Sequence, residues 1–367
     1  MRWGPVPIPG RRRVFPPSDI GDLRGVSATG QDDRTGAGAM PRVALVGAGL
    51  MGRWHAHAAR RIGASVVGVA DPDPERAARL AGSAERAFAS LPELLRAVRP
   101  DILHVCGPTG MHREAIELAL ASGVHVFVEK PLALNAAETR ELYQMAVAAK
   151  LVLCPVHQYA FQRAVERISA GLARSGPPVQ VEMTFFSAGA EGADPERLPA
   201  LAADILPHPV SIAQRFWPGE RLAALAWKIE PMGPGGWQLS AAVGDVSLRI
   251  ALSFSARPTE ASLAVRGNGG TWTADLFHGF ARFRGGTANR ATKALRPFAD
   301  AIGLLGAASG NLAGRTLRRE PAYPGLRELT ARVYAAARGT DGCPITAEAA
   351  VDVAALRDLF LECTVRR

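Results

Sequence analysis

The chain has 367 residues, of which 48% are hydrophobic and 21% charged, and its formal net charge is +9. This composition is typical of a globular protein, and the length predicts two domains. No run approaches the roughly 18 consecutive apolar residues of a membrane helix, and Arg11 to Arg13 are not followed by the apolar stretch of a secretory signal. We therefore expect a cytoplasmic protein with no membrane partner.

The positive charge is concentrated in one region. Between Arg282 and Glu328 the chain has nine cations and three anions, a local net charge of +6. Aromatic residues are not interleaved with these cations as stacking platforms, so we expect no nucleic-acid partner. A solvated basic face, attraction of a phosphorylated substrate and attraction of an anionic surface remain as readings of this region.

The four cysteines, Cys106, Cys154, Cys343 and Cys363, lie far apart without a C-x-x-C pair. The spacing indicates neither a disulfide framework nor a metal site, so we expect no metal.

In chain order, residues 1–40 come first, and they are rich in Pro, Gly, Arg and Asp without apolar periodicity. Such a segment cannot bury enough surface to offset the entropy of ordering, and we expect it to be disordered. Met40 directly precedes the first regular run, so the start of the protein at Met1 or Met40 stays open.

Residues 41–156 alternate short apolar runs with helical segments. Apolar runs predict strands at 43–46, 65–70, 102–105 and 124–128, with helices near 50–62, 74–81, 109–122 and 135–149. Strands that are apolar throughout and alternate with helices are typical of a parallel sheet covered on both faces. The sequence therefore predicts an α/β, doubly wound Rossmann domain.

Residues 157–367 have a different period. Val179, Val181, Met183 and Phe185 alternate with polar residues, and so do the apolar residues of 246–254. Strict alternation predicts an antiparallel sheet with one buried face and one that is open to substrate or a second subunit. Helices are expected near 288–307, 325–338 and 346–362, which gives an α+β second domain.

A glycine-rich turn joins the first predicted strand and helix. Gly47, Gly49 and Gly52 form G-x-G-x-x-G in the strand-turn-helix context that a dinucleotide diphosphate needs. The next strand ends before Asp71, whose carboxylate would accept hydrogen bonds from the ribose hydroxyls and would repel a 2′-phosphate. These residues predict NAD as the cofactor, and Arg76 nearby keeps NADP as the alternative.

The turn, the block at residues 101–112 and above all Val128-Glu129-Lys130-Pro131 resemble the Gfo/Idh/MocA oxidoreductases, the family of glucose-fructose oxidoreductase and inositol dehydrogenase. The resemblance is dense over residues 42–160 and thin beyond them. It implies a Rossmann domain followed by a domain with an open, mostly antiparallel sheet that often forms a subunit interface, hence a homo-oligomer.

The resemblance also implies roles for individual residues. Lys130 would lie beside the nicotinamide and hydrogen-bond the reacting oxygen, with a strained or cis bond to Pro131 aiming its ammonium. His112 is expected to pack near the cofactor and His55 to be a packing or capping residue. The implied cofactor contacts are Gly47, Gly49, Leu50, Met51, Gly52, Asp71, Pro108, Thr109, His112, Glu129, Lys130 and Gln158.

The second domain of the family contributes an Asp and a His four residues later, a spacing that occurs here at Asp204 and His208. A neutral imidazole suits proton removal from a hydroxyl, and a carboxylate beside it would fix its tautomer. Pro207 and Pro209 depart from the family pattern. We expect a helix that begins at Pro209, with His208 just before it, so that Asp204 need not share a helical face with His208.

Two functions of different class follow. The first is hydride transfer by an NAD(P)-dependent enzyme on a secondary alcohol or ketone of a sugar, nucleotide sugar or cyclitol, with the basic region favouring a phosphorylated or nucleotide-linked substrate. The alternative is a non-catalytic dinucleotide-binding regulatory protein of the same fold. Retention of both Lys130 and His208 favours the enzyme.

Overall fold

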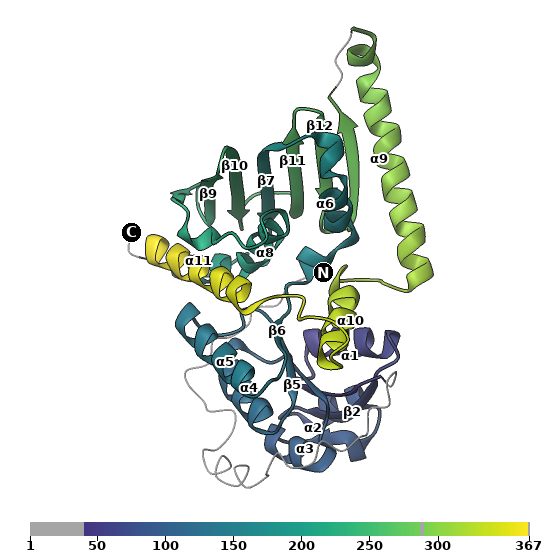
Figure 1. The fold of residues 1–367 in the computed structure, drawn as a ribbon, viewed down its shortest axis with the longest axis vertical. Coiled ribbons are helices and arrows are strands. Elements are labelled where there is room, and N and C mark those ends of the chain that lie inside the picture. Colours follow the sequence, from purple (N-terminus) through teal and green to yellow (C-terminus); the bar gives the residue numbers. More distant parts are fainter. Residues whose placement is uncertain (1–39, 287–289, 366–367) are drawn as a thin grey trace. The chain divides into compact units, whose positions relative to one another are not determined.

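The structure, a computed structural model, describes residues 40–286 and 290–365 (Figure 1). Residues 1–40 are the segment that we expect to be disordered, and residues 1–39 of it lie outside the described residues. The described chain divides into two units, each built around one sheet. The Rossmann unit runs to Val156 and includes Leu326–Ala355, and the mixed-sheet unit contains His157–Gly325 and the chain from Leu356 onward.

The Rossmann unit has a six-stranded parallel sheet in the order β3-β2-β1-β4-β5-β6. This is the doubly wound order, and it confirms the predicted fold of the first half. All residues of β4 and all but the first of β1 are buried, which explains why these strands are apolar without alternation. The strands are β1 (Arg42–Val46), β2 (Ser65–Ala70), β3 (Ala87–Phe88), β4 (Ile102–Val105), β5 (His125–Val128) and β6 (Leu153–Pro155).

Helices connect these strands, and one more comes from late in the chain. They are α1 (Leu50–Arg61), α2 (Pro74–Ala81), η3 (Ala84–Arg86), α3 (Leu91–Val98), η4 (Thr109–Met111), α4 (His112–Ala121), α5 (Ala136–Ala148) and α10 (Leu326–Ala337). The short strands β3 and β6 and the helix α3 do not appear among the predicted elements. Two or three residues are too few to display a period, whereas α3 has a recognisable start in the Ser90 cap.

The placement of α10 differs from the predicted range of 157–367 for the second domain. This helix packs on α1, and its Tyr334 is fully buried and hydrogen-bonded to His104 of β4. Residues 326–355 therefore complete the core of the Rossmann unit, although they follow the second sheet in the chain.

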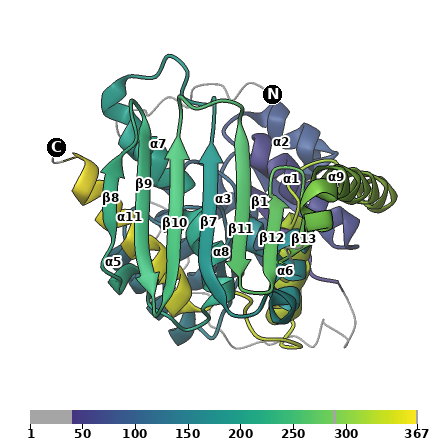
Figure 2. The same cartoon turned by 90° about the horizontal axis from the view of Figure 1, so that it is seen from above.

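The mixed-sheet unit has seven strands in the order β13-β12-β11-β7-β10-β9-β8, seen face-on in Figure 2. Of the neighbouring pairs only β7 and β10 are parallel, which confirms the expected mostly antiparallel sheet. The strands are β7 (Pro178–Phe186), β8 (Lys228–Pro231), β9 (Gly236–Val243), β10 (Val246–Ser253), β11 (Glu260–Gly267), β12 (Gly270–Asp275) and β13 (Phe280–Gly285).

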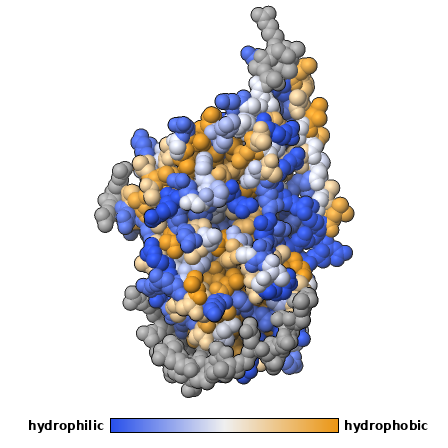
Figure 3. All heavy atoms as spheres, viewed as in Figure 1, coloured by the Kyte–Doolittle hydropathy of each residue, from blue (hydrophilic) through white to orange (hydrophobic). Residues whose placement is uncertain are grey.

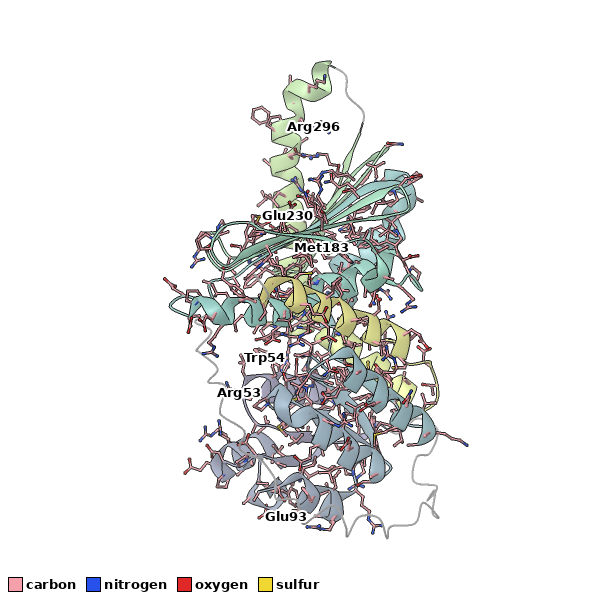
Figure 4. The ribbon with its side chains drawn as sticks, turned by 90° about the vertical axis from the view of Figure 1, so that its left-hand side faces the viewer. Arg53, Trp54, Glu93, Met183, Glu230 and Arg296 are labelled. Atoms are coloured by element: carbon pink, nitrogen blue, oxygen red, sulfur yellow. The ribbon has the colours of Figure 1, made fainter. Side chains whose placement is uncertain are left out.

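The alternation of β7 holds with one exception. Val181, Met183 and Phe185 are buried, and Met183 is labelled within the sheet in Figure 4. Val179 was expected on the same face but is 48% exposed. The pairing with β11 skips Val179 at an irregularity between Arg266 and Gly267, so the side chain leaves the buried face at a bulge.

The helices of this unit are η5 (Gln158–Phe161), α6 (Arg163–Ser175), η6 (Pro195–Arg197), α7 (Leu198–Ile205), α8 (Pro207–Phe216), η7 (Leu222–Ala224) and α9 (Arg290–Arg318), and α11 (Ala347–Val365) belongs to both units. α6 covers one face of β11 to β13. Gly171 of α6 has no room for a Cβ because the Trp272 ring lies against it, and Trp272 Nε1 donates to the Gly171 carbonyl at 3.1 Å. α9 is longer than the predicted 288–307 and contains Pro297.

Candidate cofactor and substrate site

The glycine-rich turn lies at the carboxyl end of β1, between β2 and β4. Gly47 has φ of 95°, and a Cβ there would lie 2.8 Å from the backbone of Cys106. A Cβ at Gly52 would lie 2.0 Å from the carbonyl oxygen of Gly47. Both glycines are therefore required by the close packing of the turn against its own helix and the neighbouring loop.

Gly49 is different, because a Cβ there would meet no atom of the described residues within 4 Å. The helix α1 that follows has no side-chain cap and no acidic residue in its first turn. The N–H groups of its first turn and its positive dipole end follow directly after Gly49. This arrangement suits a dinucleotide diphosphate, with Leu50, 47% exposed, and Met51 beside it.

Asp71 follows β2 and is 6% exposed. Its Oδ2 accepts a hydrogen bond from Ala48 N at 2.7 Å, and its Oδ1 accepts one from Asp73 N at 2.9 Å. Arg76 Nη2 lies 3.3 Å from Oδ1. The carboxylate is thus fixed beside the turn, while Arg76, whose side chain is 53% exposed, has the freedom to turn toward a 2′-phosphate.

Replacing Asp71 by asparagine is expected to weaken NAD binding by about tenfold, because a hydrogen bond to a charged acceptor contributes roughly 1.5–3 kcal/mol. NADP binding should fall less, since the repulsion of its 2′-phosphate is removed. Asparagine keeps one acceptor for Ala48 N, which alanine would not. Calorimetric titration of both cofactors tests this, with Glu75→Gln, an exposed change in the nearby helix α2, as the control. An equal loss for both cofactors would contradict the ribose assignment.

Glu129 and Lys130 follow β5, at the same edge of the sheet. Glu129 is 7% exposed, and its Oε2 accepts a hydrogen bond from Lys130 N at 3.2 Å. The Lys130-Pro131 bond is cis, as the resemblance led us to expect. Lys130 is half-buried, so its position lies at the rim of this carboxyl edge.

His112 begins α4, after the loop of Pro108 and Thr109, and is 1% exposed. Its Nδ1 lies 2.9 Å from the carbonyl of Pro131 and its Nε2 lies 2.9 Å from that of Gly107. Burial lowers the pKa of His112, so the neutral ring donates to one of these carbonyls at a time. The imidazole joins the loops after β4 and β5, which makes it a structural link near the expected cofactor position.

In the mixed-sheet unit, His208 lies in an aromatic environment. Its ring centroid is 4.5 Å from that of Tyr159 and 6.4 Å from that of Phe185. His208 is 9% exposed. Gln158, adjacent to Tyr159 in η5, is 5% exposed, and its Oε1 has no hydrogen-bond partner among the described residues. The structure thus brings the segment of Gln158 next to His208, and a buried acceptor there suits a polar ligand.

The predicted start of the helix at Pro209 was wrong. α8 begins at Pro207, and His208 lies inside its first turn. Both prolines occupy positions whose N–H groups would have no partner within α8, so the helix tolerates them. α7 ends at Ile205, so Asp204 and His208 belong to different helices.

Asp204 has a partner in the last helix of the chain. Arg357 Nη2 lies 3.3 Å from Asp204 Oδ1, and the Asp204 side chain is 47% exposed. A pairing of Asp204 with His208 stays a prediction, and the ion pair with α11 gives Asp204 a structural role.

Most of the basic region is engaged within the protein. Arg282 and Arg284 both form ion pairs with Asp300, and Arg318 pairs with Glu320 at 3.3 Å. Arg315 donates to the carbonyls of His278, Glu320 and Pro321. These guanidinium groups stabilise the packing of α9.

His55 has a more specific role than packing. Its ring is fully buried in α1, with Nε2 3.1 Å from Glu129 Oε1. His55 and Glu129 are 74 positions apart, so the sequence did not predict this contact. A histidine on the helix that follows a glycine turn was nevertheless a usable signal.

Among the described residues, no cluster of three or more metal-ligating side chains occurs. The helices of the described part include none long and apolar enough to cross a membrane.

Residues 41–157 match the family described as "Oxidoreductase family, NAD-binding Rossmann fold", GFO_IDH_MocA. Over 117 residues the chain is 38% identical to UDP-N-acetylglucosamine 3-dehydrogenase of Acidithiobacillus ferrooxidans, which covers 32% of this chain and 36% of the relative. It is 32% identical over 151 residues to D-apiose dehydrogenase of Paraburkholderia graminis, 40% of each chain. The matches thus span two fifths or less of these curated relatives.

Similarity of fold extends further than similarity of sequence. The WlbA dehydrogenase from Bordetella pertussis, solved in complex with NADH and UDP-GlcNAcA, covers 90% of this chain and 97% of its own, with a TM-score of 0.69 and 17% identity. The similarity of fold to this dehydrogenase therefore extends over both units of the chain.

Proposed function

We propose, because residues 41–157 match the NAD-binding Rossmann oxidoreductase family, that this chain transfers hydride between nicotinamide and a secondary alcohol or ketone of a sugar, nucleotide sugar or cyclitol. The observation that supports this most is the common edge of the sheet. The glycine turn, Asp71 and Lys130 directly follow β1, β2 and β5, where open α/β sheets bind ligands. The names of similar proteins support the substrate class.

The bound nicotinamide would supply the hydride donor or acceptor. Lys130 would donate a hydrogen bond from Nζ to the reacting oxygen of the substrate and lower the energy of its developing charge. His208 would take the hydroxyl proton during oxidation and return it during reduction, with Gln158 hydrogen-bonding the substrate or cofactor. Asp204 is proposed to support His208 only through the position of its helix.

The test is a screen of sugars, cyclitols and nucleotide sugars with the full chain, following nicotinamide absorbance with NAD and with NADP. We expect at least one compound to be oxidised with NAD, or its ketone reduced with NADH. If calorimetry shows cofactor binding while the whole panel stays unreacted, the non-catalytic regulatory reading replaces this proposal.

We also propose a homo-oligomer in the cytoplasm, and an exposed apolar row on α9 supports the assembly. Its side chains recur at spacings of three, four and seven residues and are 64–71% exposed: Leu295, Phe298, Ile302, Leu305 and Leu312. Figure 3 shows apolar residues along this edge of the molecule. The spacing is that of a coiled-coil seam, and two copies would bury on the order of 1,000 Å², the lower limit of a specific interface.

The double change Ile302→Glu with Leu305→Glu is expected to reduce the mass of the particle in light scattering, because two buried charges would face each other across the seam. Leu317→Glu is the control, since Leu317 is 84% exposed but lies off the row. A wild-type monomer, or a double variant of unchanged mass, would contradict the seam.

A further inference from the structure

A continuous chain of hydrogen bonds runs from Glu129 to α10 through the core of the Rossmann unit. Beyond the contact of His55 with Glu129, His55 Nδ1 lies 2.9 Å from His104 Nδ1, and His104 Nε2 lies 3.0 Å from Tyr334 Oη. Both histidines and Tyr334 are 0% exposed. Buried polar atoms thus connect four elements, which are α1, β4, α10 and the end of β5.

The chemistry of these groups orders the chain in one direction. Burial lowers the pKa of His104 and raises the pKa of Tyr334, so the imidazole is neutral and the phenol keeps its proton. One arrangement that gives every ring nitrogen a partner starts at the phenol. Tyr334 Oη–H donates to His104 Nε2, His104 Nδ1–H donates to His55 Nδ1, and His55 Nε2–H donates to Glu129 Oε1.

An aromatic ring lies beside the two histidines. Phe127 packs against both imidazoles, with centroid distances of 5.2 Å. Besides His55 and the adjacent Lys130, Glu129 interacts with the Cys106 thiol, whose pKa is raised by burial, and with His112, whose pKa is lowered by burial. The chain therefore ends at a single carboxylate, which also accepts the backbone N–H of Lys130.

We infer that His55, His104 and Tyr334 are positioning residues: they fix Glu129, and through it the backbone from which Lys130 reaches the reacting oxygen. This inference rests on the proposed function for its catalytic consequence, and on the geometry alone for the ordering of the rings. Tyr334 thus controls the orientation of Lys130, although it lies 230 positions from His104 in the chain. Its helix is also distant in sequence from the glycine turn.

Tyr334→Phe tests the inference with little disturbance of packing, because it removes one oxygen. His104 Nε2 then loses its donor, the ring is free to change tautomer, and His55 Nδ1 loses its own donor in turn. We expect the ¹⁵N signals of both histidine rings to shift in NMR spectra, and kcat to fall about tenfold while the Kd of NAD stays within about twofold.

Tyr143→Phe is the matched control. Tyr143 is also a buried tyrosine of the Rossmann unit, 7% exposed, but its Oη has no hydrogen-bond partner among the described residues. It should leave the ring signals and kcat unchanged. If Tyr334→Phe leaves the His55 signals unchanged as well, the chain does not transmit and the inference is overturned.

A second variant separates transmission from simple loss of packing. His104→Phe should lower kcat like Tyr334→Phe, and the double variant should be no worse than either single one, because both interrupt the same chain. Additive losses would overturn the inference. If no substrate is found, the proposed hydride transfer fails, whereas the NMR comparison still decides the ordering of the rings.

Discussion

Lys130→Ala is expected to lower kcat for hydride transfer by on the order of 10²–10⁴-fold, the contribution of a well-placed proton donor or acceptor. The ammonium would be the group closest to the charge that develops on the reacting oxygen, and alanine leaves nothing in its place. Cofactor affinity should stay within about threefold, because the diphosphate and ribose are held by the glycine turn and Asp71.

Steady-state kinetics and calorimetric titration with NAD measure these two effects separately. Lys293→Ala, which removes an exposed lysine from α9, controls for the loss of one positive charge. Normal turnover in the Lys130 variant would remove the lysine from the reaction, and a large loss of NAD affinity would make it a cofactor ligand instead.

The second large effect concerns two glycines of the same turn that should respond differently to alanine. At Gly52 the added methyl would overlap the Gly47 carbonyl at 2.0 Å, so the turn must move. We expect Gly52→Ala to cost about 1–3 kcal/mol of unfolding free energy and to lose NAD binding. At Gly49 the methyl meets no atom within 4 Å in the part of the chain that the structure describes, so the melting temperature should not change.

Gly49→Ala should nevertheless weaken NAD at least tenfold, because the methyl occupies the space that a diphosphate oxygen requires. Thermal denaturation and calorimetric titration of both variants give the comparison. Should the Gly49 variant bind NAD with wild-type affinity, the diphosphate does not lie over this turn.

The sequence predicted those parts of the site that depend on local pattern. The glycine turn, Asp71 and Lys130 each follow directly after a buried strand, and parallel strands bring their carboxyl ends to one edge. The ends of α1 and α2 were predicted to within one residue, because apolar spacing lies within each segment and α2 also has the Asp73 cap.

Prolines and glycines were harder to interpret. Pro207 and Pro209 suggested a later helix start, although both fit the first turn of α8. α9 continues to Arg318 through four interior glycines, and the length of the predicted helix stopped near the second of them. The prolines follow a local rule, since the first turn of a helix tolerates them, whereas the interior glycines of α9 occur despite their low helix propensity.

Contacts between distant residues were outside the reach of the sequence. The partners of His55 lie 49 and 74 residues away, and none of the four side chains from Glu129 to Tyr334 carries a motif for the others. A buried histidine on an apolar face is most often a core residue with one hydrogen bond. The sequence therefore does not predict that His55 takes part in a longer chain of hydrogen bonds.

The late arrival of α10 in the Rossmann unit has a consequence for synthesis on the ribosome. When residue 156 has been translated, all six strands of the first sheet exist, yet the donor for His104 and the helix that covers α1 have not been made. The nascent unit must wait until Tyr334 emerges before its interior closes. Residues 40–156 expressed alone should therefore form an aggregation-prone, protease-sensitive fragment. Adding α10 as a peptide should protect this fragment from proteolysis.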